Sequence, residues 1–166
     1  MNAVSQNSAV DDAWAILAEI PDPEIPVISL VELGIIRDVR LTDGRVEVDV
    51  LPTYSGCPAT EVIEADVRAA LAEGGLPNPT VRRILSPAWT TDFIADSGRE
   101  KLRAYGIAPP AGRVGKRSIF AEDRPAACPR CASTRTSRVS DFGSTPCKAS
   151  WRCDACLEPF EYFKCI

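Results

Sequence analysis

Residues 35–50 read IIRDVRLTDGRVEVDV, and this pattern determines the architecture of the first part of the chain. Before the central Asp43-Gly44 pair, apolar and charged residues alternate. After it, valine alternates with glutamate and aspartate. Two runs of period two joined by an Asp-Gly turn predict an antiparallel β-hairpin with one apolar face. Such a hairpin needs further elements to cover that face.

The segments on either side of the hairpin supply those elements. Residues 1–10 are small and polar, and we expect them to fray, whereas Pro21–Pro26 holds three prolines and predicts an extended turn. Ser97-Gly98-Arg99-Glu100 is a capping-box pattern. Helices are predicted at 11–20, 58–73 and 97–106. A third strand is predicted at 81–85. The order α-β-β-α-β-α predicts a small α+β domain with helices over a mixed sheet.

The 166 residues suit one ordinary domain plus a small appendage. We expect the first domain at 11–106, a linker rich in proline, glycine and basic residues at 107–127, and a β module at 128–166. The two parts of the chain also differ in charge. Residues 1–112 carry 17 acidic and 9 basic side chains, whereas residues 113–166 carry 6 acidic and 10 basic side chains. The net charges are therefore −8 and +4.

Several classes of protein are excluded by what the sequence lacks. It contains no histidine, which excludes Ser-His-Asp and Cys-His catalysis, H-E-x-x-H metalloproteases and Rieske centres. The first residues have neither the basic nor the apolar region of a secretory signal, and no apolar run approaches the ~20 residues that span a bilayer. We expect a cytoplasmic protein without a membrane segment.

Six of the seven cysteines lie after residue 127, and four of them form two C-x2-C motifs separated by 21 residues. Two such motifs complete a tetrahedral four-sulfur site, which suits structural Zn2+ and also accepts iron or an iron–sulfur centre. The predicted ligands are Cys128, Cys131, Cys153 and Cys156. Short strands are expected at 134–139, 148–152 and 160–164, so the tail is predicted to be a zinc-ribbon-like β module whose metal is part of its folding.

Cys147 and Cys165 stand outside the two motifs. If the Cys153–Cys156 turn closes a hairpin in which residue 151 pairs with 161, then Cys147 pairs with Cys165 across the strands. Such a pair is interpreted as two small buried residues, as a redox pair or as a second metal contact.

Cys57 is the single cysteine of the first part of the chain. Because Pro58 suits the first turn of a helix, we expect Cys57 at the helix N-cap, where backbone N–H groups and the helix dipole favour a thiolate. Cys57 is then either a reactive thiol with affinity for soft metals or a buried structural residue.

Three motifs of the first part resemble the metal–sulfur cluster assembly family of SufT type: Asp22–Val27, Leu33–Ile36 and Pro52–Ala59. The tail is similar to that of the PaaD family of phenylacetyl-CoA epoxidase systems, in its two C-x2-C motifs and in two further segments. Those segments are Phe142–Ala149 and Pro159–Cys165. The resemblance covers residues 11–166.

The resemblance implies a place in bacterial phenylacetate catabolism, an aromatic degradation pathway. It implies partners among the other epoxidase subunits, which include a diiron oxygenase and a flavin/[2Fe–2S] reductase. It also implies a transient metal or cluster site formed by Asp22, Glu24, Thr53 and Cys57. No catalytic residue is assigned, and we expect an accessory protein that assists metal or Fe–S centre assembly.

Two alternatives stay open. The first is an integral electron-transfer subunit with iron in the tail. The second is a nucleic-acid-binding zinc ribbon, which the −8 charge of the first part and the lack of a dense basic stripe disfavour.

Overall fold

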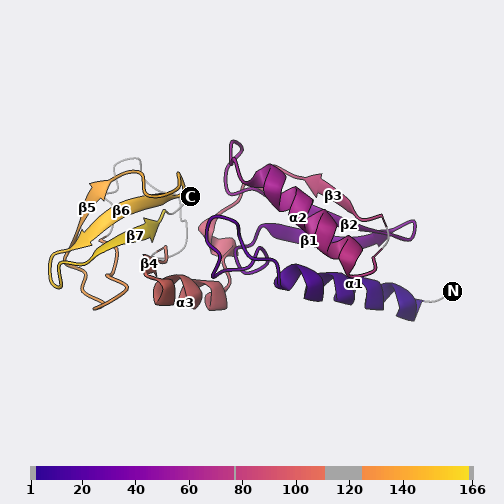
Figure 1. Cartoon of the computed structure of the whole chain (residues 1–166), viewed down its shortest axis with the longest axis horizontal. Coiled ribbons are helices and arrows are strands. Elements are labelled where there is room, and N and C mark those ends of the chain that lie inside the picture. Colours follow the sequence, from indigo (N-terminus) through magenta and orange to yellow (C-terminus); the bar gives the residue numbers. More distant parts are fainter. Residues whose placement is uncertain (1–2, 77, 111–124, 165–166) are drawn as a thin grey trace. The chain divides into compact units, whose positions relative to one another are not determined.

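The computed structural model describes residues 3–76, 78–110 and 125–164 (Figure 1). The chain forms two compact units that divide between Trp89 and Thr90. Among the described residues, no helix has both the length and the apolar character needed to cross a membrane.

The first unit is a three-stranded sheet with two helices. Its elements are α1 (Ala3–Ala18), β1 (Ile36–Thr42), β2 (Arg45–Val50), α2 (Thr60–Glu73) and β3 (Thr80–Arg83). The strand order is β1-β2-β3, with β1 and β2 antiparallel and β2 and β3 parallel, so α2 is the crossover between two parallel strands. Helix α1 contacts α2, β1 and β2 (Figure 1). The predicted hairpin and the mixed sheet are confirmed.

The two faces of this sheet differ in chemistry. Val46, Val48 and Val50 are buried and alternate along β2 with Glu47 and Asp49. The apolar face therefore forms the core with the helices, and the opposite face is ionic. There Asp49 accepts hydrogen bonds from Arg40 and from Arg82, each at 2.9 Å at the closest. Burial alone would raise the pKa of Asp49, but the two guanidinium groups outweigh it and lower that pKa.

The second unit begins with a 3-10 turn, η1 (Thr91–Phe93), and α3 (Asp96–Tyr105). Its sheet has the order β4-β7-β6-β5, in which β4 is parallel to β7 and the other pairs are antiparallel. The strands are β4 (Ile107–Ala108), β5 (Thr136–Ser140), β6 (Lys148–Cys153) and β7 (Pro159–Phe163).

The N-terminal ends of all three helices differ from the predictions. Helix α2 begins at Thr60 rather than at residue 58. Helix α1 begins at Ala3 rather than near Asp11. Helix α3 has Ala95 as its N-cap, so Ser97 lies within the helix and no side chain caps it. Its C-terminal end is as predicted, because Gly106 has a φ of 98°, which glycine adopts without steric cost.

The division between the units also lies earlier than the predicted boundary at residue 106. Trp89 belongs to the first unit, where its indole N–H donates to the Leu33 carbonyl at 3.2 Å. Helix α3 contacts β4, and the buried pair Ile107 and Ala108 joins the tail sheet instead of opening a linker. Two residues are too few to display a strand pattern in the sequence. Most of the predicted linker, 111–124, lies outside the described residues.

Candidate metal centre and assembly loop

The two C-x2-C motifs fold into turns with the same backbone geometry. In each, the first cysteine's N–H donates to the carbonyl five residues later over 2.9 Å. The residue after each motif has a positive φ, 59° at Ala132 and 65° at Leu157. This left-handed step reverses the chain so that both sulfurs of a motif lie on the same side of the backbone.

The turns bring the four predicted ligand sulfurs together. All four lie within 4.8 Å of one another, with 3.8 Å between Cys128 Sγ and Cys156 Sγ and 3.6 Å between Cys131 Sγ and Cys153 Sγ. Tetrahedral coordination with metal–sulfur bonds of ~2.3 Å requires sulfur separations of ~3.8 Å. Four thiolates in this arrangement fit Zn2+, and they equally fit iron. In the described part of the chain, no other group of three or more Cys, Asp or Glu side chains is arranged to hold a metal.

The site is buried on one side and open on the other. Cys128 and Cys153 are 2% and 0% exposed, whereas Cys131 and Cys156 are exposed. The backbone N–H of Cys156 hydrogen-bonds to the Cys153 sulfur and, helped by the Ala155 N–H, lowers the pKa of that thiol to about 6 despite its burial. At Cys153, backbone donors therefore stabilise the thiolate that a metal requires, whereas burial and the neighbouring sulfurs raise the pKa of Cys156 to about 12.

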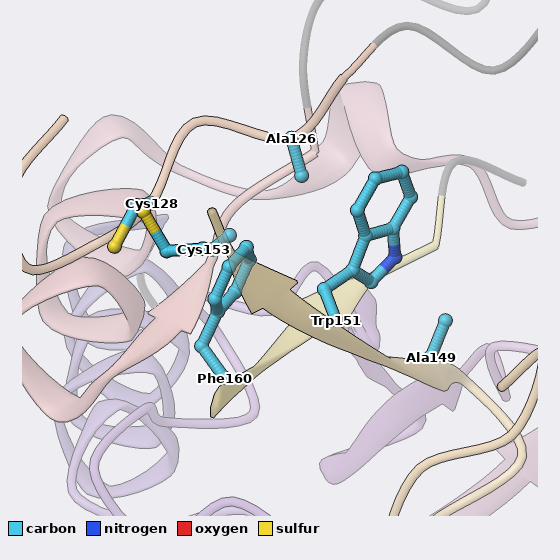
Figure 2. Close-up of a cluster of buried hydrophobic side chains, with 7 residues drawn as sticks. Ala126, Cys128, Ala149, Trp151, Cys153 and Phe160 are labelled. Carbon is cyan, nitrogen blue, oxygen red and sulfur yellow. The ribbon is translucent and has the colours of Figure 1, made fainter. Parts of the chain in front are cut away.

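The two inner cysteines are part of the hydrophobic core of the tail. Figure 2 shows them in one cluster with Trp151, Phe160 and small alanine side chains. The Trp151 and Tyr162 rings meet edge to face, with centroids 5.9 Å apart. Since the four predicted ligands and this core share side chains, we expect metal binding and tail folding to be coupled.

The predicted register of the tail hairpin is wrong by one residue. Trp151 pairs with Phe160 rather than with residue 161, because four residues rather than five lie between Cys153 and its hydrogen-bonded partner Glu158. In this register the Cys147 carbonyl accepts from the N–H of Lys164 at 3.0 Å. Cys147 is buried, with its sulfur 3.0 Å from the Thr145 hydroxyl. Cys165 lies outside the described residues. Its predicted direct pairing with Cys147 was conditional on residue 151 pairing with 161, and in the observed register the partner of Cys147 is Lys164.

Cys57 lies in a turn before α2 and not at the N-cap, which is Ala59. Its N–H donates to the Tyr54 carbonyl at 3.1 Å, and its own carbonyl accepts from the N–H and the hydroxyl of Thr60. The residue is half-buried beside exposed Ser55 and Gly56. The turn therefore holds a partly accessible thiol at a fixed position next to the start of a helix.

The other predicted residues of the assembly site have different surroundings. Asp22 is buried, and its Oδ1 accepts the N–H groups of Glu24 and Ile25 at 2.9 and 2.8 Å. This carboxylate therefore organises the proline-rich turn. Thr53 is buried and Glu24 is half-buried. Within the described residues, Cys57 belongs to no group of three metal-ligating side chains with Asp22 and Glu24.

Sequence reasoning missed a buried ion pair on the tail sheet. The Lys148 ammonium is almost fully buried and lies 3.0 Å from Glu161. The same carboxylate accepts the N–H and the hydroxyl of Ser144, so it ties the 142–147 loop to β7. Lys148 is the first residue of β6 in a segment that also contains Ser150 and Arg152, so the sequence around it did not indicate its burial.

Comparisons with known proteins agree with both units. Residues 11–85 match the family described as iron-sulfur cluster assembly protein, and residues 113–164 match the PaaD zinc beta ribbon domain. The chain also resembles a solved structure from Bacillus anthracis, a domain of unknown function DUF59. The TM-score is 0.57 and the identity 25%, over 61% of this chain and 97% of that one.

Two curated relatives extend the comparison. The Bacillus subtilis "Fe-S protein maturation auxiliary factor YitW" is 35% identical over 83 residues, which cover 48% of this chain and 78% of that protein. An Escherichia coli protein whose name makes it a component of 1,2-phenylacetyl-CoA epoxidase is 50% identical over 158 residues, or 95% of this chain and 93% of that protein. Because this likeness spans almost the whole of both chains and the tail matches the PaaD ribbon, the chain belongs to the PaaD family.

Proposed function

We propose that this chain is an accessory subunit of a phenylacetyl-CoA epoxidase system that assists the assembly of a metal or iron–sulfur centre in that system. It does not itself catalyse the epoxidation. Its partners are the other epoxidase subunits, with the diiron oxygenase or the flavin/[2Fe–2S] reductase as its client.

One observation carries the proposal: a single chain combines an iron-sulfur assembly domain with a PaaD ribbon. The relatives of the first part alone are described as Fe-S protein maturation factors, and the relative of the whole chain as an epoxidase component. The presence of both domains in one chain supports the proposal of a maturation factor dedicated to one enzyme system. The lack of histidine also leaves few groups for oxygen activation.

Cys57 is the proposed point of contact with the transferred metal or cluster. The turn between Tyr54 and Thr60 fixes its backbone, and its half-buried sulfur remains accessible. A single thiolate holds a soft metal only weakly, so it suits transient binding in which the client supplies the remaining ligands. Asp22 supports this site by ordering the proline-rich turn, and Glu24 and Thr53 are its further proposed residues.

The tail site has a structural role in this proposal. Zn2+ bound by Cys128, Cys131, Cys153 and Cys156 would supply cross-links that hold the two turns together. The inner cysteines then complete the core around Trp151, and the outer two face solvent. The ribbon so formed presents the basic part of the chain to a partner.

The test uses cells whose own copy is replaced by Cys57→Ala, with Ser55→Ala in the same turn as the matched control. The Cys57 variant should yield soluble epoxidase deficient in iron, and the Ser55 variant should yield fully metallated enzyme. Chemical reconstitution of the iron and [2Fe–2S] centres should restore turnover without this protein. Metal content per enzyme complex and turnover of phenylacetyl-CoA are measured.

The rival function is electron transfer through iron in the tail. It predicts that fully metallated epoxidase and reductase stay inactive until this chain is added in stoichiometric amount. It also predicts a coloured protein with thiolate-to-iron charge-transfer bands, whereas a zinc protein is colourless. The first result would replace the maturation role by the electron-transfer role. The second would replace structural zinc by iron in the tail.

A further inference from the structure

The four sulfurs of the tail site make two contacts between its turns. Cys131 Sγ lies 3.6 Å from Cys153 Sγ, and Cys128 Sγ lies 3.8 Å from Cys156 Sγ. Each contact joins one cysteine of the first C-x2-C turn to one of the second, and each joins an exposed residue to a buried one. Because sulfurs in a disulfide are ~2.05 Å apart, the sulfurs of each pair have to approach by only about 1.6–1.8 Å to form a bond.

The exposed member of each pair is accessible to an oxidant in solution, and the buried member is not. Cys131 and Cys156 are exposed, whereas Cys128 and Cys153 lie in the core with Trp151 (Figure 2). Oxidation therefore starts at an outer sulfur, and the inner sulfur across the turns is in contact with it. An accessible thiolate beside a second, resolving cysteine is the arrangement of redox-sensitive cysteines.

Cys153 is prepared to act as the resolving nucleophile. Its sulfur accepts the backbone N–H groups of Ala155 and Cys156, each at 3.4 Å. These donors stabilise the thiolate, which is the form of cysteine that attacks an oxidised sulfur. The first reaction is therefore assigned to the pair of Cys131 and Cys153.

We propose that the tail site is redox-sensitive, and that hydrogen peroxide converts Cys131 and Cys153 to a disulfide with release of the metal. First, the Cys131 thiolate attacks peroxide, the O–O bond breaks, and a sulfenic acid forms as hydroxide leaves. Next, the Cys153 thiolate attacks that sulfur, the S–S bond forms, the S–O bond breaks, and a second hydroxide leaves. The two sulfurs supply the two electrons that reduce one peroxide. A metal ion that loses two of its four ligands is no longer held.

The oxidised tail differs from a tail that has only lost its metal. A second peroxide joins Cys128 to Cys156 in the same way, and the two disulfides then link the same two turns that the metal links. The oxidised tail therefore keeps its sheet without metal, whereas chelation leaves four thiols and no cross-link. This inference depends on the four-sulfur site and not on the proposed role of Cys57.

The experiment treats the reduced full chain, loaded with one equivalent of Zn2+, with a small molar excess of hydrogen peroxide. A weak chromophoric chelator follows the released Zn2+, and free thiols are alkylated before digestion. Trypsin cleaves after Arg130 and separates the two cysteines of the first motif. A protease specific for aspartate cleaves at Asp154 and separates those of the second. Mass spectrometry then identifies which cysteines are linked.

The disulfide between Cys131 and Cys153 should form first, with about one Zn2+ released per chain, and that between Cys128 and Cys156 should follow. Circular dichroism should show that the oxidised tail keeps its β-structure, whereas a reduced chain stripped with a strong chelator loses it. Dithiothreitol together with Zn2+ should restore the starting state.

The matched control is Cys147→Ser, because Cys147 is a buried cysteine of the same unit outside the four-sulfur cluster. This variant should release Zn2+ at the wild-type rate and form the same disulfides. A much slower release would assign the sensitivity to Cys147 and overturn the proposal.

Three further results would overturn it: Zn2+ that stays bound in peroxide, a disulfide within either C-x2-C motif, and sulfinic acid at Cys131 without a disulfide. The maturation role is tested separately, by the iron content of epoxidase from cells with Cys57→Ala. Each proposal can therefore fail while the other stands.

Discussion

Among single residues, Cys131 gives the sharpest test of the tail site. It is an exposed ligand, so Cys131→Ser removes a sulfur without creating a void in the core. The variant should lose the metal, about one ion per chain in the wild type, and the tail should unfold. Elemental analysis and NMR spectra should show this loss, with the signals of residues 11–85 unchanged.

Cys147→Ser is the matched control for that experiment, because Cys147 lies outside the four-sulfur cluster. It should keep the metal. A Cys131 variant that retains a full equivalent of tightly bound zinc would show that the cluster is not the metal site.

Asp49 should make the first unit sensitive to acid. Its folded pKa is lowered, so its ion pairs stabilise the fold fully above the unfolded value of about 3.9 and are lost as the pH falls through the folded pKa. Asp49→Asn should cost about 1–2 kcal/mol at pH 7. It should also flatten the decline of stability below about pH 4.

The control for Asp49 is Asp38→Asn, because Asp38 is an exposed partner of the same Arg40. Its effect should stay within about 0.5 kcal/mol. Thermal unfolding of the first unit between pH 2 and pH 7 checks both variants. An acid limb that is unchanged in Asp49→Asn would mean that other carboxylates cause the decline.

Single residues also show where sequence reasoning succeeds. The four tail cysteines were identified because C-x2-C spacing is a local property, and the structure brings their sulfurs within 4.8 Å. The place of Cys57 was wrong because Pro58 suits both the first turn of a helix and the turn before it. The hydrogen bonds from Thr60 to the Cys57 carbonyl place Pro58 in the turn before the helix. They depend on where α2 packs, which the local sequence does not specify.

At the level of elements, the two metal-binding turns each contain a residue held in a left-handed conformation. Ala132 has a φ of 59°, which costs an L-residue roughly 1 kcal/mol that glycine avoids. Ala132→Gly should therefore raise the stability of the zinc-bound tail by about 0.5–1 kcal/mol. Chemical unfolding followed by circular dichroism measures the change.

Ala155→Gly provides the contrast, since Ala155 is exposed in the second turn and has no positive φ. It should leave the tail unchanged or slightly destabilised, because glycine only increases the freedom of the unfolded chain there. Equal effects of the two substitutions would rule out relief of backbone strain as the cause.

Among the secondary-structure elements, some follow from a local sequence pattern and others depend on contacts with distant residues. The hairpin of β1 and β2 follows from period-two alternation around Asp43-Gly44, and it formed as predicted. The β6–β7 register did not, because the number of residues in the closing turn depends on the left-handed step at Leu157. Strand β4 was missed since its two residues gain their place only by pairing with distant β7.

For the whole molecule, the two units differ in what stabilises them. The first unit has a core of two helices over one sheet face, and the second joins its small core to a four-sulfur cluster. We expect a core as small as that of the tail to gain much of its stability from a metal bound by the four cysteines. We expect the first unit to fold without them, because its described core contains none of the tail cysteines.

Removing the metal from the full chain should therefore unfold one unit and spare the other. In calorimetry the zinc-bound chain should show two transitions, and excess chelator should abolish only that of the second unit. Adding Zn2+ back should restore it, because the unfolded tail still carries all four ligands. NMR signals of β1, β2 and α2 should persist throughout. A single transition that chelator shifts as a whole would instead mean that the division between Trp89 and Thr90 does not separate two cooperative units.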